Sequence, residues 1–132
     1  NKMYLPIIEK GDFSYHYVNV EDQLKSPNSP LSILKKLITC RKEHKAFGYG
    51  TCRFINFKNQ AVLGTIRELP GESILALHNL SDKKISLNTT SLDLRTKTLK
   101  NFFKNEIINT NDKKNNFIDL EPYGYQWFLI KD

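Results

Sequence analysis

Asn28-Ser29-Pro30-Leu31 opens the stretch NSPLSILKKLITCRKEHKAFGYG, residues 28–50, which decides how this chain is organised. Asn28 or Ser29 can accept hydrogen bonds from the free amide groups of a first helical turn, and Pro30 suits the first helical position because no amide donor is needed there. Apolar residues then recur with the spacing of one helical face; they are Leu31, Leu34, Leu37 and Ile38. These features predict a helix over residues 29–45 that ends before Gly48 and Gly50.

After this helix, short apolar runs alternate with turn signals. Pro70-Gly71 and Pro122-Tyr123-Gly124 are typical of turns. Several short strands at this spacing predict a mainly β fold, an antiparallel β-sandwich preceded by one α-helix. The predicted strands are residues 52–57, 61–69, 73–80, 84–87, 98–102, 117–120 and 125–130. The run Ile74-Leu75-Ala76-Leu77 is apolar on both faces, which favours a central position for its strand.

The first 28 residues carry too many apolar and aromatic side chains for a free tail. We predict an irregular segment there that packs on another part of a protein. One helix covers little of a sheet, and its own apolar stripe needs a partner. We therefore expect these 132 residues to be part of a larger protein.

Composition excludes several classes of function. The net charge of +6 is spread over both halves, whereas a nucleic-acid site needs a concentrated basic face with aromatic side chains between the charges. We therefore expect no nucleic-acid partner. No apolar run approaches the roughly 20 residues that span a bilayer, so we expect no membrane partner. No signal-peptide pattern is visible at the start, and a cytoplasmic location is expected.

Cysteine and histidine are too scattered for a metal site. Cys40 and Cys52 form no CxxC or Cys/His cluster, and we expect both to be reduced. We interpret His44 as a charge or cap at the end of the helix and His78 as a packed or surface residue of a strand. No metal and no cofactor are expected.

The carboxylates likewise offer no catalytic pair. Glycoside chemistry needs two carboxyl groups at a fixed separation. Glu21-Asp22 and Asp119/Glu121 are the close pairs, and neither has the buried setting that raises the pKa of a general acid. We expect no catalytic residues in this chain.

Several ordered motifs resemble the α-amylase superfamily, glycoside hydrolase family 13. Residues 4–8 (YLPII), 15–23 (YHYVNVEDQ) and 26–29 (SPNS) are similar to the end of its catalytic barrel, and residues 37–44 (LITCRKEH) to its eighth barrel helix. Within the superfamily, residues 4–6 (YLP) before 19–21 (NVE), together with residues 120–128 (LEPYGYQWF), most resemble the trehalose synthases, which interconvert maltose and trehalose. Residues 78–82 (HNLSD) are similar to a strand-to-turn signature of their C-terminal domain. From about residue 88 to residue 116 no resemblance is found.

The resemblance implies a division into residues 1–50, the last loop and last helix of a barrel, and residues 51–132, a C-terminal β-sandwich. The family's three catalytic acids would lie upstream. This region would be non-catalytic and would pack on the barrel of the same chain. Its sugar partners, maltose, trehalose or an α-glucan, would then be bound only in the intact enzyme. The stripe of Leu34, Leu37 and Ile38 becomes an expected docking surface, and self-association through this helix face is expected where the barrel is missing.

The segment from Tyr15 to Gln23 matches the loop after the last barrel strand, on the active-site side of such a barrel. We hypothesise that Tyr15, Tyr17, Asn19 or Glu21 shapes the sugar pocket of the intact enzyme. The alternative is that these residues only fix the loop against the barrel.

Two further functions stay open. The sandwich is a carbohydrate-binding module if exposed aromatic side chains, with Tyr49, Tyr123 and Tyr125 as candidates, hold sugars. Alternatively, the chain is the same region of an oligo-1,6-glucosidase-like hydrolase.

Overall fold

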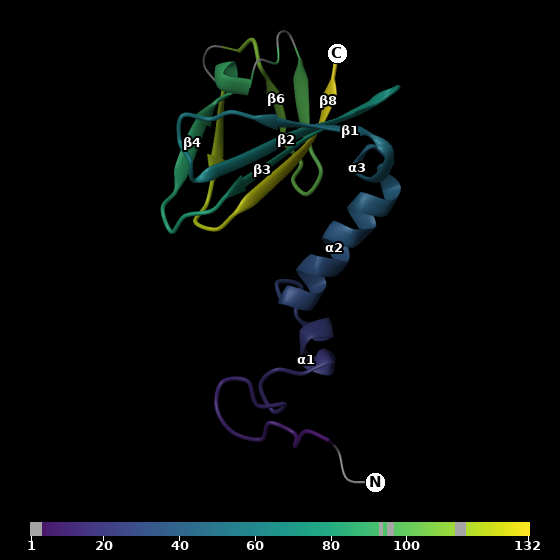
Figure 1. Cartoon of the computed structure of the whole chain (residues 1–132), viewed down its shortest axis with the longest axis vertical. Coiled ribbons are helices and arrows are strands. Elements are labelled where there is room, and N and C mark those ends of the chain that lie inside the picture. Colours follow the sequence, from purple (N-terminus) through teal and green to yellow (C-terminus); the bar gives the residue numbers. More distant parts are fainter. Residues whose placement is uncertain (1–3, 93, 95–96, 113–115) are drawn as a thin grey trace. The chain divides into compact units, whose positions relative to one another are not determined.

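The computed structural model describes residues 4–92, 94, 97–112 and 116–132. It divides into two compact units, Asn1–Arg41 and Lys42–Asp132. The helices come first along the chain and the strands follow (Figure 1). The predicted division at residue 50 concerns domains of a longer enzyme and stays a prediction.

Helix α2 (Pro30–Glu43) begins where the sequence predicts. The Ser29 hydroxyl accepts a hydrogen bond from the Ser32 amide at 3.1 Å, which is the geometry of an N-terminal cap. The same hydroxyl donates to the Gln23 carbonyl at 2.6 Å. The helix ends two residues before the predicted boundary. A short helix, α3 (Ala46–Tyr49), follows it.

The sequence predicted an irregular N-terminal segment, but part of this segment is helical. Helix α1 (Val20–Lys25) forms there, and Asn19 caps it by accepting from the Asp22 amide at 2.8 Å. None of its residues is buried. A helix of six residues is too short for the spacing of its apolar residues to reveal it in a sequence.

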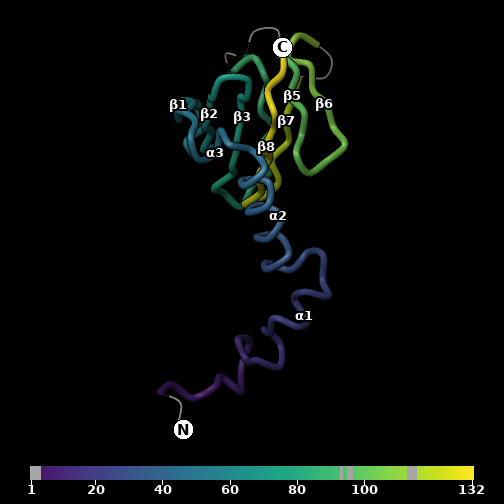
Figure 2. Tube along the Cα trace, turned by 90° about the vertical axis from the view of Figure 1, so that its right-hand side faces the viewer, coloured from purple at the N-terminus to yellow at the C-terminus, as the bar shows by residue number. Residues whose placement is uncertain are grey.

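Two antiparallel sheets form the second unit. The six-stranded sheet has the order β1-β2-β3-β8-β5-β6, which Figure 2 shows side by side, and β4 pairs with β7. The strands are β1 (Thr51–Ile55), β2 (Val62–Leu69), β3 (Glu72–Asn79), β4 (Ile85–Asn88), β5 (Thr98–Asn101), β6 (Ile107–Asn109), β7 (Phe117–Leu120) and β8 (Tyr125–Lys131). All strand pairs are antiparallel. The predicted sandwich is therefore confirmed, with β3 in the centre of its sheet.

Two local predictions need correction, and a third falls partly outside the described residues. Strand β6 was not predicted, because its three residues border an Asn- and Lys-rich stretch. The loop predicted at residues 88–91 contains the end of β4 and the 3₁₀ helix η1 (Thr89–Leu92). Within the loop or hairpin predicted at residues 109–116, Asn109 ends β6, whereas residues 113–115 lie outside the described residues.

The core lies between the two sheets. Ile66, Leu75 and Phe128 of the larger sheet belong to one buried cluster with Ile118 and Leu120 of β7, and all five are at most 1% exposed. Burial of such a side chain contributes about 1.5–3 kcal/mol to folding. The opposite side of the larger sheet is called the outer face here. Strand register places on it Leu63 and Thr65 of β2, Ala76 and His78 of β3, and Tyr125 and Trp127 of β8.

Among the described residues, no helix is both long and apolar enough to cross a membrane.

Candidate functional site

The four residues predicted to shape a sugar pocket lie just before and within α1. Tyr15, Asn19 and Glu21 line an open pocket of about 400 Å³ together with His16 and Asp22. Tyr17 is not part of its lining, and 78% of its surface is exposed. The structure thus brings three of the four residues together.

Hydrogen bonds within this segment fix its shape. The Asn19 amide donates to the Tyr15 carbonyl at 3.1 Å and to the Asp22 carboxylate at 2.8 Å. Glu21 pairs with Lys25 at 2.8 Å, one helical turn later. The Tyr15 ring lies 4.0 Å from the His16 ring, measured between centroids. Asn19 therefore holds the loop against the start of α1.

The carboxylates of this pocket do not have the setting of the acid–base pair that hydrolysis needs. Glu21 and Asp22 are both exposed, whereas a general acid needs a desolvated carboxyl group. In the described part of the chain, no three residues among His, Cys, Asp and Glu form a metal-binding group.

A cluster of aromatic rings covers part of the outer face. Trp127 lies between Phe47 of α3, at 4.8 Å between centroids, and Phe103, at 5.6 Å. The indole N–H of Trp127 donates to His78 Nε2 at 3.3 Å. Burial lowers the pKa of His78. This bond also needs an unprotonated Nε2 atom, so His78 is a packed strand residue, as the sequence predicted.

Large apolar side chains remain exposed on this outer face, next to the aromatic cluster. They come from four segments of the sheet: Phe54 of β1, Leu63 of β2, Phe103 after β5 and Ile107 of β6. Large exposed apolar patches are typical of interaction surfaces, so this face is a candidate for one.

A contact that the sequence did not reveal joins β3 to the segment after α2. Glu72 Oε1 lies 2.6 Å from His44 Nδ1, and Glu72 Oε2 accepts from the Ala46 amide at 2.7 Å. Burial acts to raise the pKa of Glu72, but the hydrogen bond from Ala46 and the pairing with His44 lower it overall. His44 is thus tied to a carboxylate 28 positions away, and a local reading as a helix-end charge missed this.

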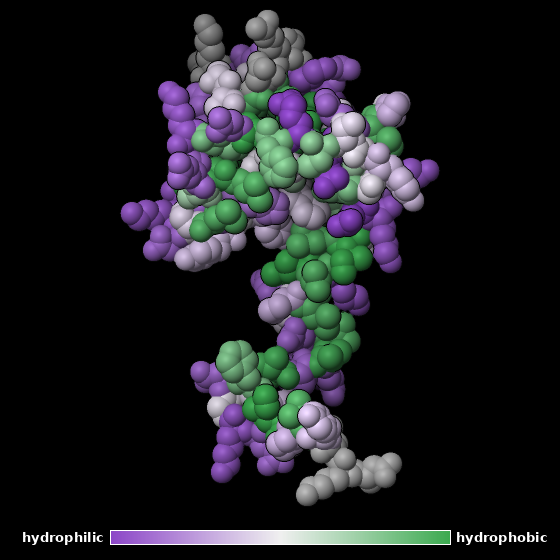
Figure 3. All heavy atoms as spheres, viewed as in Figure 1, coloured by the Kyte–Doolittle hydropathy of each residue, from purple (hydrophilic) through white to green (hydrophobic). Residues whose placement is uncertain are grey.

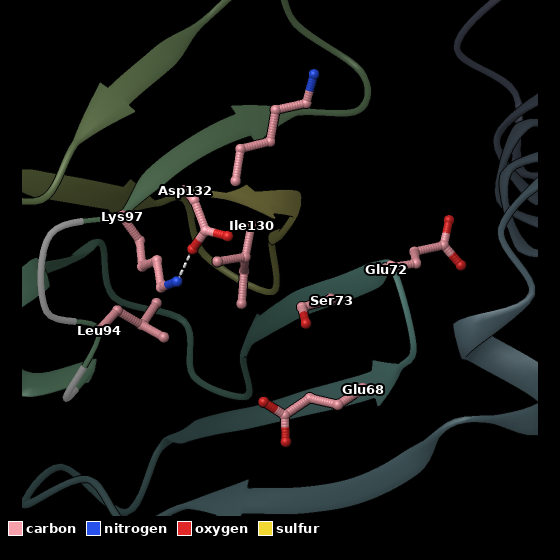
Figure 4. A pocket seen from close by; sticks show the side chains of 9 residues that line it. Glu68, Glu72, Ser73, Leu94, Lys97, Ile130 and Asp132 are labelled. Atoms are coloured by element: carbon pink, nitrogen blue, oxygen red, sulfur yellow. Dashed lines mark hydrogen bonds and ion pairs between the residues drawn. The ribbon is translucent and has the colours of Figure 1, made fainter.

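A second pocket, of about 420 Å³, lies within the sandwich unit (Figure 4). Leu94 and Ile130 give it an apolar part, and Lys97 forms an ion pair with Asp132. Glu68 and Ser73 contribute polar groups from β2 and β3. These side chains show no nucleophile hydrogen-bonded to a base, so the pocket offers no catalytic arrangement.

The tyrosines considered for a sugar-binding module are not arranged in a row. Tyr125 packs edge-on against Phe103 at 5.8 Å. Tyr49 and Tyr123 are 82% and 72% exposed, and neither makes a ring contact with another described residue.

The comparison with protein families concerns the sandwich. The family model described as maltogenic amylase, C-terminal domain, matches residues 52–127. The chain belongs to this family. The matched residues include all strands from β2 to β7, most of β1 and the first three residues of β8.

Similar curated proteins are trehalose synthases. The trehalose synthase of Thermus thermophilus is 40% identical over 80 residues, which cover 60% of this chain and 8% of the relative. That of Pimelobacter sp. (strain R48) is 42% identical over 84 residues, which cover 61% of this chain and 15% of the relative. The resemblance to the C-terminal region of trehalose synthases in the α-amylase superfamily is thus confirmed. The chain spans less than one sixth of the length of these relatives.

Solved structures share the fold. The trehalulose synthase MutB of Pseudomonas mesoacidophila MX-45 aligns with a TM-score of 0.70 at 20% identity, over 89% of this chain and 20% of that protein. At this identity the similarity concerns the fold alone.

Proposed function

We propose that this chain is the non-catalytic C-terminal region of a trehalose synthase-like enzyme that interconverts maltose and trehalose. Its role is to pack on the catalytic barrel upstream in the same polypeptide and to stabilise it. The observation that carries this proposal is the amount of apolar surface that the chain leaves uncovered. The corresponding region of an oligo-1,6-glucosidase-like hydrolase would have the same role.

Helix α2 supplies the first part of this surface. Its only buried residue is Cys40, and Leu34 and Ile38 are 53% and 43% exposed. Figure 3 shows apolar residues gathered on the surface over this helix. An amphipathic helix is stabilised mainly by burying its apolar face. The barrel is the partner proposed for it.

The outer face of the six-stranded sheet supplies the second part. Phe54 and Ile107 stand more than 60% exposed on its two edge strands. Covering a side chain of this size contributes about 1.5–3 kcal/mol. A few such contacts would stabilise the barrel substantially, because whole domains are stable by only about 5–15 kcal/mol.

The loop before α1 is the proposed link to the substrate. In the intact enzyme, Tyr15, Tyr17, Asn19 and Glu21 would shape the sugar pocket, with the catalytic acids on the barrel. The exposed rings of Tyr15 and Tyr17 and the pocket beside Asn19 support this assignment. A cytoplasmic location, expected from the sequence, is part of the same proposal.

The test introduces a charge on the proposed docking face of α2. In the intact enzyme, Leu34→Lys should lower the melting temperature by several degrees, because it removes about 1.5–3 kcal/mol of apolar burial. Thr39→Lys is the matched control, since Thr39 is an exposed residue of the same helix. Equal melting temperatures for the two variants would contradict the docking role.

A second measurement addresses catalysis. The chain of residues 1–132 should leave maltose unchanged, whereas the intact enzyme converts it. Conversion of maltose by the chain alone would overturn the non-catalytic assignment.

In the intact enzyme, replacing Tyr17 and Asn19 should change the kinetics with maltose. Unchanged kinetics would mean that these two residues have a purely structural role.

A further inference from the structure

A third pocket, also of about 420 Å³, lies beside β7 in the sandwich unit. Its wall on β7 carries Phe117 and Asp119, which alternate with the buried Ile118 and Leu120. Lys84, Lys104 and Glu106 face the same space. Its β7 wall belongs to the two-stranded sheet, which lies on the other side of the core from the outer face.

Buried amide groups fix the floor of this pocket. Gln126, 8% exposed, donates to the Asp119 carbonyl at 2.8 Å and accepts from Asn101 at 2.6 Å. The Asn101 side-chain oxygen accepts from the Phe103 and Lys104 amides at 2.9 and 3.1 Å. The loop that carries Lys104 is therefore tied to the same network as β7. A ligand meets walls whose positions are set before it binds.

The charged groups on the rim are paired as well. Lys84 lies 3.1 Å from Asp119 and 3.2 Å from Glu121. The hydrogen bond from Ser86 and then that from Lys84 lower the pKa of Asp119. Lys84 and Lys104 nearly balance Glu106, Asp119 and Glu121. Such a rim gives no net attraction to an anion, but it offers acceptors and donors side by side to a ligand that carries hydroxyl groups.

Phe117 adds a flat apolar surface to this polar rim. Its side chain is 54% exposed, although a large apolar ring gains free energy when it is covered. A pyranose ring presents C–H groups on one face and hydroxyl groups around its edge. It can therefore cover Phe117 while its hydroxyl groups reach Asp119 and Lys84.

We propose that this pocket, formed by Phe117, Asp119, Lys84, Lys104, Glu106 and Gln126, binds a neutral gluco-oligosaccharide. The site is separate from the loop before α1, and it does not depend on the proposed role of the chain in packing on a barrel. It would hold a sugar chain on the sandwich without acting on it.

Titration calorimetry with maltoheptaose and the chain of residues 1–132 tests the proposal. The unmodified chain should show saturable binding. Phe117→Ala should weaken it about tenfold, which corresponds to about 1.4 kcal/mol, because the ring that the sugar covers is removed. Phe54→Ala is the matched control, because Phe54 is an exposed phenylalanine outside the pocket. It should bind as the unmodified chain does.

A second variant and a second ligand sharpen the test. Asp119→Asn keeps the shape of the side chain but removes the carboxylate, so it should also weaken binding while the melting temperature changes little. No saturable binding to the unmodified chain, or equal affinities of the Phe117→Ala variant and the unmodified chain, would overturn the proposal. Tighter binding of a phosphorylated maltose than of maltose would overturn the assignment to a neutral ligand.

Discussion

At the scale of single residues, the pairing of Glu72 with His44 and Ala46 gives the sandwich a pH-dependent contact. Glu72 is 22% exposed, and both of its carboxylate oxygens are engaged. Folding lowers the pKa of Glu72 below its ordinary value of 4.5. The ionised carboxylate therefore stabilises the fold above that pH, and this contribution is lost as the pH falls through the lower, folded value.

The variant Glu72→Gln should show this dependence. Near neutral pH it should lose about 1–2 kcal/mol of unfolding free energy, because hydrogen bonds to charged groups contribute about 1.5–3 kcal/mol and partial exposure reduces this. The loss should shrink as the pH falls below 4.5. Glu72 of the unmodified chain then becomes protonated and is uncharged, as the glutamine of the variant is. Urea unfolding at a series of pH values measures the loss. The control is Glu43→Gln, because Glu43 is an exposed carboxylate next to His44 in the sequence. A loss that is the same at every pH would contradict the linkage.

At the scale of the elements, β2 passes close to the loop that precedes it. A Cβ atom on Gly64 would lie 2.5 Å from Phe57 Cε2 and 3.1 Å from Leu77 Cδ2. Gly64→Ala should therefore destabilise the chain by about 1–3 kcal/mol, the usual cost of overpacking a core. Phe57→Leu in the same chain should restore part of this loss.

The control for that substitution is Gly48→Ala in α3, where a Cβ atom meets nothing within 4 Å. This variant should be neutral or slightly stabilising, because alanine loses less backbone entropy than glycine. Thermal unfolding compares the two variants directly. If Gly64→Ala were as stable as Gly48→Ala, the close packing of Phe57 on β2 would be wrong.

The start of α2 and most strands were predictable because their signals are local. Ser29 and Pro30 mark a helix start by their own chemistry, and turns such as Pro70-Gly71 separate the strands. Helix α1 and β6 were missed since six and three residues carry little periodicity. The contacts of Glu72 with His44, and of Gln126 with Asn101 and Asp119, join elements that meet only through sheet pairing. No local sequence pattern predicts these contacts.

The candidate sites follow the same rule. Tyr15, Asn19 and Glu21 lie within seven residues of one another, so a loop and a short helix suffice to place them around one pocket. The pocket beside β7 needs Lys84, Lys104 and Phe117 from three separate segments. These three residues become neighbours only when the two sheets close over the core, and the sequence gives no sign of it.

At the scale of the whole molecule, the proposed role gives one substitution opposite effects in two settings. Phe54 is exposed on edge strand β1, and the proposal covers it with a barrel. In the chain of residues 1–132, Phe54→Lys should reduce self-association, because it removes an exposed apolar group and adds charge. In the intact enzyme the same change should lower stability by about 1.5–3 kcal/mol, since a charge replaces a buried ring.

Sedimentation velocity of the chain and thermal unfolding of the intact enzyme measure the two effects. Gln60→Lys, at an exposed position between β1 and β2, adds the same charge away from the outer face and should leave stability unchanged. An intact enzyme that tolerates Phe54→Lys as well as Gln60→Lys would mean that the barrel does not cover the edge at β1. Reduced self-association of the chain without any loss in the enzyme would then assign Phe54 to contacts between copies of the chain.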